Sequence, residues 1–380
     1  MTISRRNFFQ KCAFGAVSGV PISFSRGLGF PGQLPSPQTL QAPGPIRLDK
    51  NENAYGPSDI AKQAMGESLG LANRYPDLEY KHLSETIAAL HGVSPVRVVL
   101  GCGSSEILRM AATAFLGPGK KLILASPTFE LIADDARRLG ARVESVPLTK
   151  RYAHNLSAML RGVGSSTGLI YICNPNNPTG SLTPRQDLEG FIRDLPPDVA
   201  VVVDEAYHHY VGKTSSYASF LDRSVEDDRV IVTRTLSAIY GLAGLRIGYG
   251  IVASKTAGRL SAVRLQSDIN VIAARAAVAA LTDPDHVRIR WQQNANDRQE
   301  FLNMANARML RVIDSHTNFV MLKTGGHGQD VTQHFNQNGI LLGPLVPSMP
   351  TYVRVSLGTP AEMKEFWRVW DLMPAQKMAM

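Results

Sequence analysis

The sequence has 380 residues, of which 44% are hydrophobic and 19% charged, a composition typical of a globular protein with room for two hydrophobic cores. The formal net charge is +8, but four basic side chains lie in residues 1–26, a segment without acids, so the remainder carries +4. This charge is too small to indicate nucleic-acid binding. No apolar run approaches the ~20 residues that a transmembrane helix needs. We therefore expect a soluble protein of two domains, without a nucleic-acid or metal site.

The amino terminus begins MTISRRNFFQKCAFGAVSGVPISF. A twin arginine precedes a weakly apolar stretch, a pattern that resembles a twin-arginine export signal rather than part of the fold. A basic start with a chance arginine pair is the alternative, and no clear cleavage site follows. The prediction is a signal in residues 1–26, a Pro/Gly-rich linker in 27–45, and a periplasmic or exported location. Without a working signal the location would be cytoplasmic.

From about residue 73, short β-branched runs alternate with helical patterns. Runs that are apolar on both faces and separated by helix-sized intervals predict a mostly parallel sheet covered by helices on both sides. The predicted strands are residues 97–100, 121–125, 168–173, 199–203 and 230–233. Ligands bind such sheets where loops leave the carboxyl ends of the strands. The residues that follow each run are therefore the candidates for a functional site.

The carboxyl-terminal third has a different pattern. Helices are predicted over residues 261–281, which would join the two domains, and from about 286 to 312. Alternating residues at 318–322 and 351–356 predict antiparallel strands of a small α+β domain. The predicted division of the chain is a segment at 46–72 that joins the small domain, a large domain at 73–275 and a small domain at 276–380.

Three loops after predicted strands carry polar residues suited to a ligand. Gly101-Cys-Gly-Ser-Ser-Glu106 opens a helix, where free backbone N–H groups and the helix dipole bind phosphate, although Ser104 could equally be a plain helix cap. Asn174-Pro-Asn-Asn-Pro-Thr-Gly180 is a rigid turn that can hold asparagine amides toward a phenolic oxygen or carboxylate; a purely structural turn would not require two asparagines. Asp204 follows a buried strand, where a carboxylate needs a cation or a donor, and a helix cap is the alternative there.

Seven motifs, in this order along the chain, carry a resemblance to a known family. They are Asp49–Pro57, Asn73–Pro76, Gly101–Glu106, Asn174–Gly180, Asp204–Tyr207, Gly241–Arg246 and Tyr352–Ser356. Over residues 48–372 the sequence resembles the fold-type-I, class I/II pyridoxal-phosphate aminotransferases, most closely the histidinol-phosphate aminotransferase-like branch. The resemblance implies an α/β fold, with a mostly parallel sheet sandwiched by helices and a smaller α+β domain. It also implies a homodimer that binds pyridoxal 5′-phosphate and transfers amino groups, in ping-pong fashion, between an amino acid or amine and a 2-oxo acid.

The resemblance also assigns roles to residues of this sequence. It surrounds the cofactor phosphate with Gly103, Ser104, Thr235, Ser237 and Arg246, and with Tyr75 from a partner subunit. It surrounds the cofactor ring with Phe129, Asn177, Asp204 and Tyr207. Asp204 would keep the pyridine nitrogen protonated, which makes the ring an electron sink. Asn177 and Tyr207 would hydrogen-bond the ring hydroxyl, and Phe129 would stack on the ring face.

On the substrate side, the resemblance implies Tyr55, Asn177 and Arg354. Arg354 would clamp the α-carboxylate as a bidentate fork, and a solvated charge on a strand is the alternative for that arginine. Where relatives that use histidinol phosphate commonly have another arginine, this chain has Gly343, which has no side chain to bind a phosphate. We therefore expect a different L-amino acid or amine to be the preferred substrate.

One position departs from the family. The lysine that holds the cofactor as a Schiff base comes eight residues before the phosphate-binding arginine, and here that position is Ala238. The lysine also carries a proton between the substrate and the cofactor. Alanine can do neither, and loss of a general acid/base alone costs about 10²–10⁴ in rate. The prediction is that pyridoxal phosphate binds non-covalently or as an external aldimine, and that catalysis is impaired.

Three explanations of Ala238 remain open: a replacement of the lysine made to trap a substrate adduct, a natural pseudoenzyme, or another amine such as Lys50 or Lys213 in its place. The other cofactor contacts are intact, which favours the first. An alternative from a different class is a non-catalytic protein that binds pyridoxal phosphate or its amino-acid adducts. A decarboxylase on the same scaffold is also open, because the cofactor can promote cleavage of different bonds.

Overall fold

The computed structural model describes residues 44–212, 216–222, 227–264 and 269–373. The predicted signal at 1–26 and nearly all of the predicted linker lie outside these ranges. The chain from Pro45 onward forms one compact unit. Within the described ranges, no helix has both the length and the apolar character to cross a membrane.

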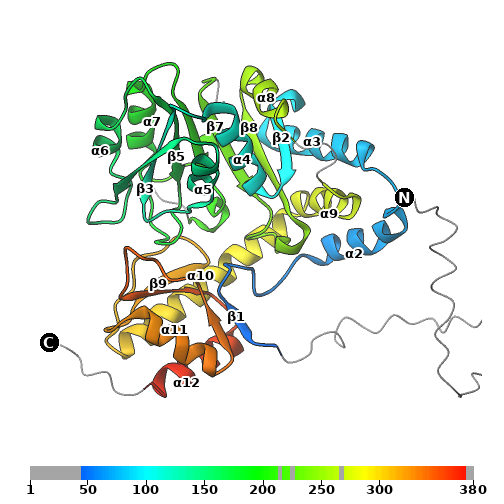
Figure 1. The fold of residues 1–380 in the computed structure, drawn as a ribbon. Helices are drawn as coiled ribbons and strands as arrows, with labels where there is room; N and C mark the ends of the chain where they lie inside the picture. Colours follow the sequence, from blue (N-terminus) through cyan, green and yellow to red (C-terminus); the bar gives the residue numbers. More distant parts are fainter. Residues whose placement is uncertain (1–43, 213–215, 223–226, 265–268, 374–380) are drawn as a thin grey trace, which may run out of the picture. The chain divides into compact units, whose positions relative to one another are not determined.

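A seven-stranded sheet forms the centre of the larger part of this unit, the upper part in Figure 1. Its order is β2-β8-β7-β6-β5-β3-β4, and β8 alone runs against its neighbours. The strands are β2 (Val98–Cys102), β3 (Lys121–Ser126), β4 (Arg142–Pro147), β5 (Thr167–Cys173), β6 (Ala200–Asp204), β7 (Val230–Thr235) and β8 (Ile247–Val252). The predicted mostly parallel sheet and its five predicted strands are confirmed. Two strands of this sheet were not predicted: β4, an edge strand with a single buried residue, and β8, whose two glycines weaken a strand signal.

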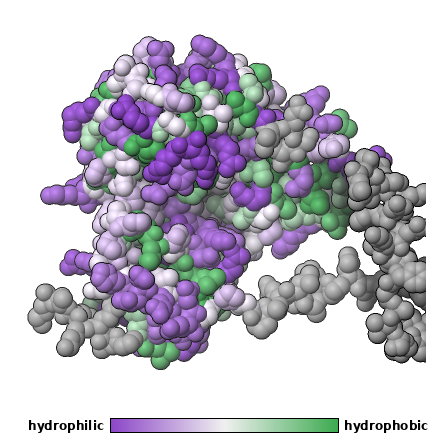
Figure 2. All heavy atoms as spheres, in the orientation of Figure 1, coloured by the Kyte–Doolittle hydropathy of each residue, from purple (hydrophilic) through white to green (hydrophobic). Residues whose placement is uncertain are grey.

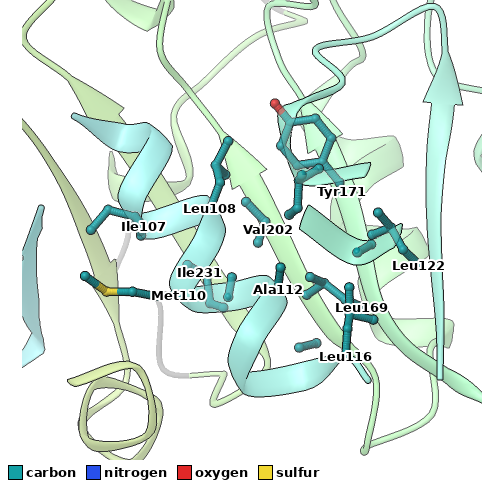
Figure 3. Close-up of a cluster of buried hydrophobic side chains, with 14 of the residues drawn as sticks. Ile107, Leu108, Met110, Ala112, Leu116, Leu122, Leu169, Tyr171, Val202 and Ile231 are labelled. Carbon is teal, nitrogen blue, oxygen red and sulfur yellow. The ribbon is translucent and has the colours of Figure 1, made fainter. Parts of the chain in front are cut away.

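Helices cover both faces of the sheet because successive strand residues point to opposite sides. On one face lie α4 (Ser104–Phe115), α5 (Leu131–Arg138) and α8 (Ser254–Ser261). Figure 3 shows the apolar side of α4, including Leu108 and Ala112, packed over Leu169 and Val202 of the strands. On the other face lie α6 (Leu156–Arg161) and α7 (Arg185–Asp194), and, against β2 and β8, α2 (Asp59–Ser68), α3 (Asp77–His91) and α9 (Val271–Leu281).

A second hydrophobic core lies in the carboxyl-terminal part of the unit. The antiparallel pair predicted there is confirmed as β9 (Phe319–Lys323) and β11 (Tyr352–Ser356). The short strands β1 (Ile46–Leu48) and β10 (Ile340–Leu342) pair in parallel, which ties the start of the unit to its end. The helices around these strands are α10 (Pro284–Ala307), α11 (Gly328–Gln337) and α12 (Pro360–Asp371). Short 3₁₀ turns occur at Leu69–Leu71, Pro95–Arg97, His208–Tyr210, Phe220–Asp222 and Ala243–Leu245.

The single helix predicted over residues 261–281 is wrong. Helix α8 ends at Ser261 and α9 begins at Val271, where the Asn270 side chain accepts a hydrogen bond from the Ala273 backbone N–H at 2.8 Å. Helix α9 shares a core with α2 and α3, so it does not connect the two cores. That connection is made by α10, which packs against the His208–Tyr210 turn and against α12. It ends at Ala307, short of the predicted residue 312.

Candidate active site

A cavity of about 610 Å³ opens at the carboxyl ends of β5, β6 and β7. Its wall also includes the start of α4, the segment after β1 and residues from β10 and β11. Nine of the residues singled out from the sequence line it: Ser104, Phe129, Asn177, Asp204, Tyr207, Thr235, Ser237, Arg246 and Arg354. The sheet therefore brings together side chains that come from most of the length of the chain.

One end of the cavity forms an anion cradle, which we define as Gly103, Ser104, Thr235, Ser237 and Arg246. Helix α4 begins at Ser104, and Gly103 before it has φ 78°, a conformation that favours glycine. The Arg246 guanidinium lies so close to Gly103 that a Cβ there would collide with it. Arg246 Nη1 donates to Ser237 Oγ at 3.2 Å. Hydroxyl groups, an arginine and the free N–H groups of a helix start thus converge on one point, which suits a phosphate.

Gly248 allows this cradle to form. A Cβ at Gly248 would collide with the backbone of Ser104, so the missing side chain lets β8 pack directly against the start of α4. Gly248 was not among the predicted site residues. Its signal was available, because it lies two residues after Arg246 in a strand where glycine marks a close backbone approach.

Asp204 lies buried at the end of β6. Its carboxylate accepts hydrogen bonds from Tyr171 Oη at 2.8 Å, Thr233 Oγ1 at 2.9 Å and the Ala206 backbone N–H at 3.2 Å. Burial raises the pKa of the Asp204 carboxyl, while the hydrogen bonds from Tyr171 and Thr233 oppose that rise. No described cationic side chain forms an ion pair with Asp204, so a cationic ligand group would stabilise its charge.

A chain of hydrogen bonds links the other polar side chains of the wall. Arg354 Nη1 donates to Asn177 Oδ1 at 2.8 Å, and Arg354 Nη2 donates to the Asp49 carbonyl at 2.7 Å. Asn51 Nδ2 donates to Tyr207 Oη at 3.0 Å, and Asn177 Nδ2 lies 3.4 Å from the same oxygen. Burial raises the pKa of Tyr207 to about 12, so this phenol keeps its proton at neutral pH.

Arg354 is buried, so the alternative of a solvated strand charge is wrong. Burial lowers the pKa of its guanidinium, and its Nε has no hydrogen-bond partner among the described residues. A buried donor without a partner is costly. A carboxylate in the cavity would provide one, in the bidentate arrangement that guanidinium groups favour.

The asparagines of the turn from Asn174 to Gly180 have different roles: two stabilise the turn and one lines the cavity. The Asn174 side chain exchanges two 2.9 Å hydrogen bonds with the backbone of Thr183. Asn176 accepts from Thr128 Oγ1 at 2.7 Å. Both therefore hold the turn in place, and Asn177 is the one that lines the cavity.

Four predicted site residues do not line the cavity: Gly103, which precedes the lining residue Ser104, and Tyr55, Tyr75 and Ala238. The Tyr55 hydroxyl donates to Asp297 Oδ2 at 2.9 Å, and Tyr75 is 81% exposed. Ala238 is 4% exposed and packs in the core that contains Leu236, Ile239 and Tyr240, although Ser237 beside it does line the cavity.

Eight wall residues were not among the predicted site residues, although Lys50 was considered as a substitute amine, and Asp49, Asn51, Ser105 and Ala206 lie inside the motifs quoted above. They are Asp49, Lys50, Asn51, Ser105, Cys173, Ala206, Leu342 and Pro344. Most lie next to a predicted residue, so the signal was proximity to a motif. Leu342 and Pro344 flank Gly343 and had no chemical signal of their own.

The family model described as aminotransferase class I and II matches residues 43–369, so the chain belongs to this family of enzymes and has the fold-type-I architecture. Among its relatives, the histidinol-phosphate aminotransferase of Moorella thermoacetica is 35% identical over 85% of this chain and 84% of that protein. Histidinol-phosphate aminotransferase 1 of Nitrosococcus oceani is 36% identical over 86% and 88%.

Solved structures give the same result. The histidinol-phosphate aminotransferase of Sinorhizobium meliloti, solved in complex with pyridoxal 5′-phosphate, superposes with a TM-score of 0.80 at 26% identity, covering 91% of this chain and 100% of that one. A putative histidinol-phosphate aminotransferase of Erwinia carotovora atroseptica gives 0.81 at 28% identity, covering 86% and 94%.

Proposed function

We propose that this chain is an aminotransferase of amino acids or related amines that binds pyridoxal 5′-phosphate without a lysine at its usual anchoring position. The observation that carries the proposal is a single cavity with an anion cradle at one end and, in the same wall, a buried carboxylate that has no cationic partner among the described residues. These groups fit the phosphate and the pyridine nitrogen of this cofactor. When bound, pyridoxal phosphate supplies an electron sink for the substrate's α-carbon.

The side chains of the cavity wall would hold the cofactor ring and the substrate. Asp204 would hold a proton at the pyridine nitrogen, and Asn177 and Tyr207 would donate to the ring oxygen from the positions that their hydrogen bonds fix. Phe129 would cover the ring face. Arg354 would bind the substrate's α-carboxylate and so orient the α-carbon.

Cofactor binding is tested directly on the purified chain. We expect pyridoxal phosphate to remain bound through dialysis and to absorb in the visible or near-ultraviolet range. Arg246→Gln should weaken that binding at least about tenfold, because a charged contact to phosphate is lost. Arg193→Gln, which changes an exposed arginine of α7, is the matched control and should bind normally. Equal binding by the two variants would contradict the role of the cradle.

We also propose that Ala238 impairs turnover. It occupies the family's lysine position by count from Arg246, and its buried methyl group offers neither an amine nor a proton. Ala238→Lys should increase amino-acid-dependent 2-oxo-acid production by about 10²-fold or more. Ala238→Met has a side chain of similar length without an amine and should leave activity unchanged.

The products of the Ala238→Lys variant discriminate between the alternatives. Formation of a 2-oxo acid supports an aminotransferase, whereas release of carbon dioxide and an amine supports a decarboxylase. Continued inactivity, in a variant that still binds pyridoxal phosphate, would favour a non-catalytic binding protein.

For the substrate, we propose an L-amino acid or amine other than histidinol phosphate, although relatives carry that name. The support is Gly343, where a Cβ would lie 2.8 Å from Arg354 Nε and 3.0 Å from the Arg354 carbonyl oxygen. A second arginine at this position could not be accommodated without moving Arg354. The test is a comparison of kcat/KM in the Ala238→Lys variant across L-amino acids and histidinol phosphate. Preference for histidinol phosphate would overturn this proposal.

We further propose a homodimer formed through the α2 and α3 region. Large apolar side chains are exposed there, including Ile60, Leu69, Tyr75 and Leu78, and Figure 2 shows hydrophobic surface on the side where α2 and α9 lie. Exposed apolar patches mark interaction surfaces, and a second copy would bring its Tyr75 toward the cradle. Light scattering should give a dimer mass, and Leu78→Glu should reduce it to a monomer mass. A monomer that binds pyridoxal phosphate with full affinity would contradict this.

Finally, we propose that residues 1–26 direct twin-arginine export. A reporter fused after residue 45 should reach the periplasm, and Arg5→Lys together with Arg6→Lys should retain it in the cytoplasm. Export of both fusions would indicate a different signal.

A further inference from the structure

A lysine that is distant in sequence from Ala238 lines the candidate cavity. Lys50 contributes to the wall that also contains Asp204, Phe129 and Arg354. It is exposed, and its amine makes no hydrogen bond or ion pair with any described residue. Of the two lysines nearest to Ala238 in sequence, Lys213 is outside the described ranges, and Lys255, on α8, is 86% exposed with Asp228 4.0 Å away.

The backbone on both sides of Lys50 is fixed to the site. The Asp49 carbonyl accepts from Arg354 Nη2 at 2.7 Å. The Asn51 backbone N–H donates to Ser356 Oγ at 2.8 Å, and its side chain donates to Tyr207 Oη at 3.0 Å. Asn51 also has φ 57°, a left-handed backbone conformation that residues other than glycine rarely adopt. The hydrogen bonds around Asn51 must therefore hold its backbone in this conformation. The root of the Lys50 side chain is therefore anchored to residues proposed to contact the cofactor and the substrate.

We propose that the Lys50 amine replaces the missing lysine in covalent capture of pyridoxal phosphate. This inference rests on the proposed function, because it needs the cofactor in the cavity. The neutral amine would add to the aldehyde carbon and form a C–N bond. The aldehyde oxygen, after taking up protons, would leave as water, and a C=N bond would remain. No oxidant or reductant takes part, and an incoming amine can release Lys50 by attack on the same carbon.

The flexible four-carbon stem of a lysine gives the amine the reach that this step needs. The other use of the same amine is an ion pair with an acidic substrate. That use would leave Lys50 without a covalent bond to the cofactor. A chemical label that marks only the covalent bond therefore distinguishes the two uses.

The experiment uses the full chain with one equivalent of pyridoxal phosphate. Borohydride reduces a C=N bond to a stable amine, and peptide mass spectrometry then locates the label. We expect one label per chain, at Lys50. Excess pyridoxine 5′-phosphate, which has the ring and phosphate but no aldehyde, should protect Lys50 and leave labelling of surface lysines unchanged.

Variants make the assignment specific. Lys50→Arg should reduce the label at this peptide by at least about tenfold, because a guanidinium does not form the bond. The same variant should still retain pyridoxal phosphate non-covalently. Lys255→Arg is the matched control and should keep the Lys50 label. In Ala238→Lys, the label should move to position 238.

The outcomes separate this inference from the proposed function. Retention of pyridoxal phosphate through dialysis, with no label or with a label at another lysine, overturns the role of Lys50 and leaves the proposed function intact. Failure to retain the cofactor in every form of the chain overturns the proposed function, and the role of Lys50 with it.

Discussion

Gly343 controls how Arg354 is held. The Gly343 backbone N–H donates to the Arg354 carbonyl at 3.0 Å, and a Cβ would lie 2.8 Å from Arg354 Nε. Gly343→Ala should therefore displace the guanidinium and raise KM for carboxylate-bearing substrates about tenfold, with a smaller change in kcat. Steady-state kinetics in the Ala238→Lys background measure this. Gly190→Ala, on α7 with no atom within 4 Å of the new Cβ, is the control. Equal effects of the two substitutions would exclude a specific role for Gly343.

Asp204 should affect thermal stability in opposite ways in the ligand-free protein and in the protein with bound cofactor. Because burial raises its pKa, its charge is costly while no cation lies beside it. Asp204→Asn should therefore leave the thermal midpoint of the ligand-free protein unchanged or higher, and should abolish most of the increase caused by pyridoxal phosphate. Thermal unfolding with and without the cofactor measures both effects. A large loss of stability in the ligand-free variant would mean that Asp204 serves the fold and not the site.

The site residues that could be predicted from the sequence share one local feature. Ser104, Asn177 and Asp204 directly follow strands, so a parallel sheet places them at one edge whatever the details of the loops. Lys50 and Asn51 could not be placed in this way. Their positions depend on hydrogen bonds to Ser356 and Arg354, about three hundred residues away in sequence, and no local pattern encodes such contacts.

At the scale of elements, a buried ion pair joins β7 to the turn after β6. Arg234 Nη2 lies 2.8 Å from Glu205 Oε2, with side-chain exposures of 4% and 1%. Removing one partner of a buried pair leaves the other charge unpaired, so Glu205→Gln should lower the free energy of unfolding by about 3–5 kcal/mol. Urea unfolding measures this. Glu365→Gln, in the exposed pair with Arg368, should be neutral, and equal losses in the two variants would contradict the argument.

Strands could be predicted from the sequence where they are buried along their whole length. Strands β5, β6 and β7 are apolar on both faces, which gives a strong signal. Strand β4 lies at the sheet edge, and only one of its six residues is buried, so it lacks the apolar run that marks the inner strands. The predicted helix over 261–281 failed because alanine and leucine continue the helical pattern, while the Asn270 cap that starts α9 carries a weak local signal.

At the scale of the whole molecule, histidines that are partly or fully buried make stability depend on pH. Burial lowers the pKa of His91 and of His154 to about 4, and it also lowers those of His208 and His209. In the unfolded chain histidines titrate near pH 6.5. Below that pH the unfolded state binds more protons than the folded state, so stability decreases as the pH falls from about 6.5 toward 4. Each such histidine contributes up to about 1.4 kcal/mol per pH unit.

Urea unfolding at several pH values between 7.5 and 4.5 measures this dependence. His91→Gln should reduce the slope, because one buried titrating group is removed. His82→Gln changes an exposed histidine of α3 and should preserve the slope. A flat profile in the unsubstituted protein would exclude linkage through the buried histidines.

The pairing of β2 with β8 has a consequence for the order of folding. Val98 lies opposite Ile251 in that pair, and the anion cradle contains the residues that follow β2 and the arginine that precedes β8. Pairing of strands so distant in sequence carries a large loop-closure cost and forms slowly. During synthesis the cradle therefore cannot exist until β8 has been made and has entered the sheet. A phosphate-bearing ligand would bind only after β8 has joined the sheet, so its retention would report that this sheet is complete.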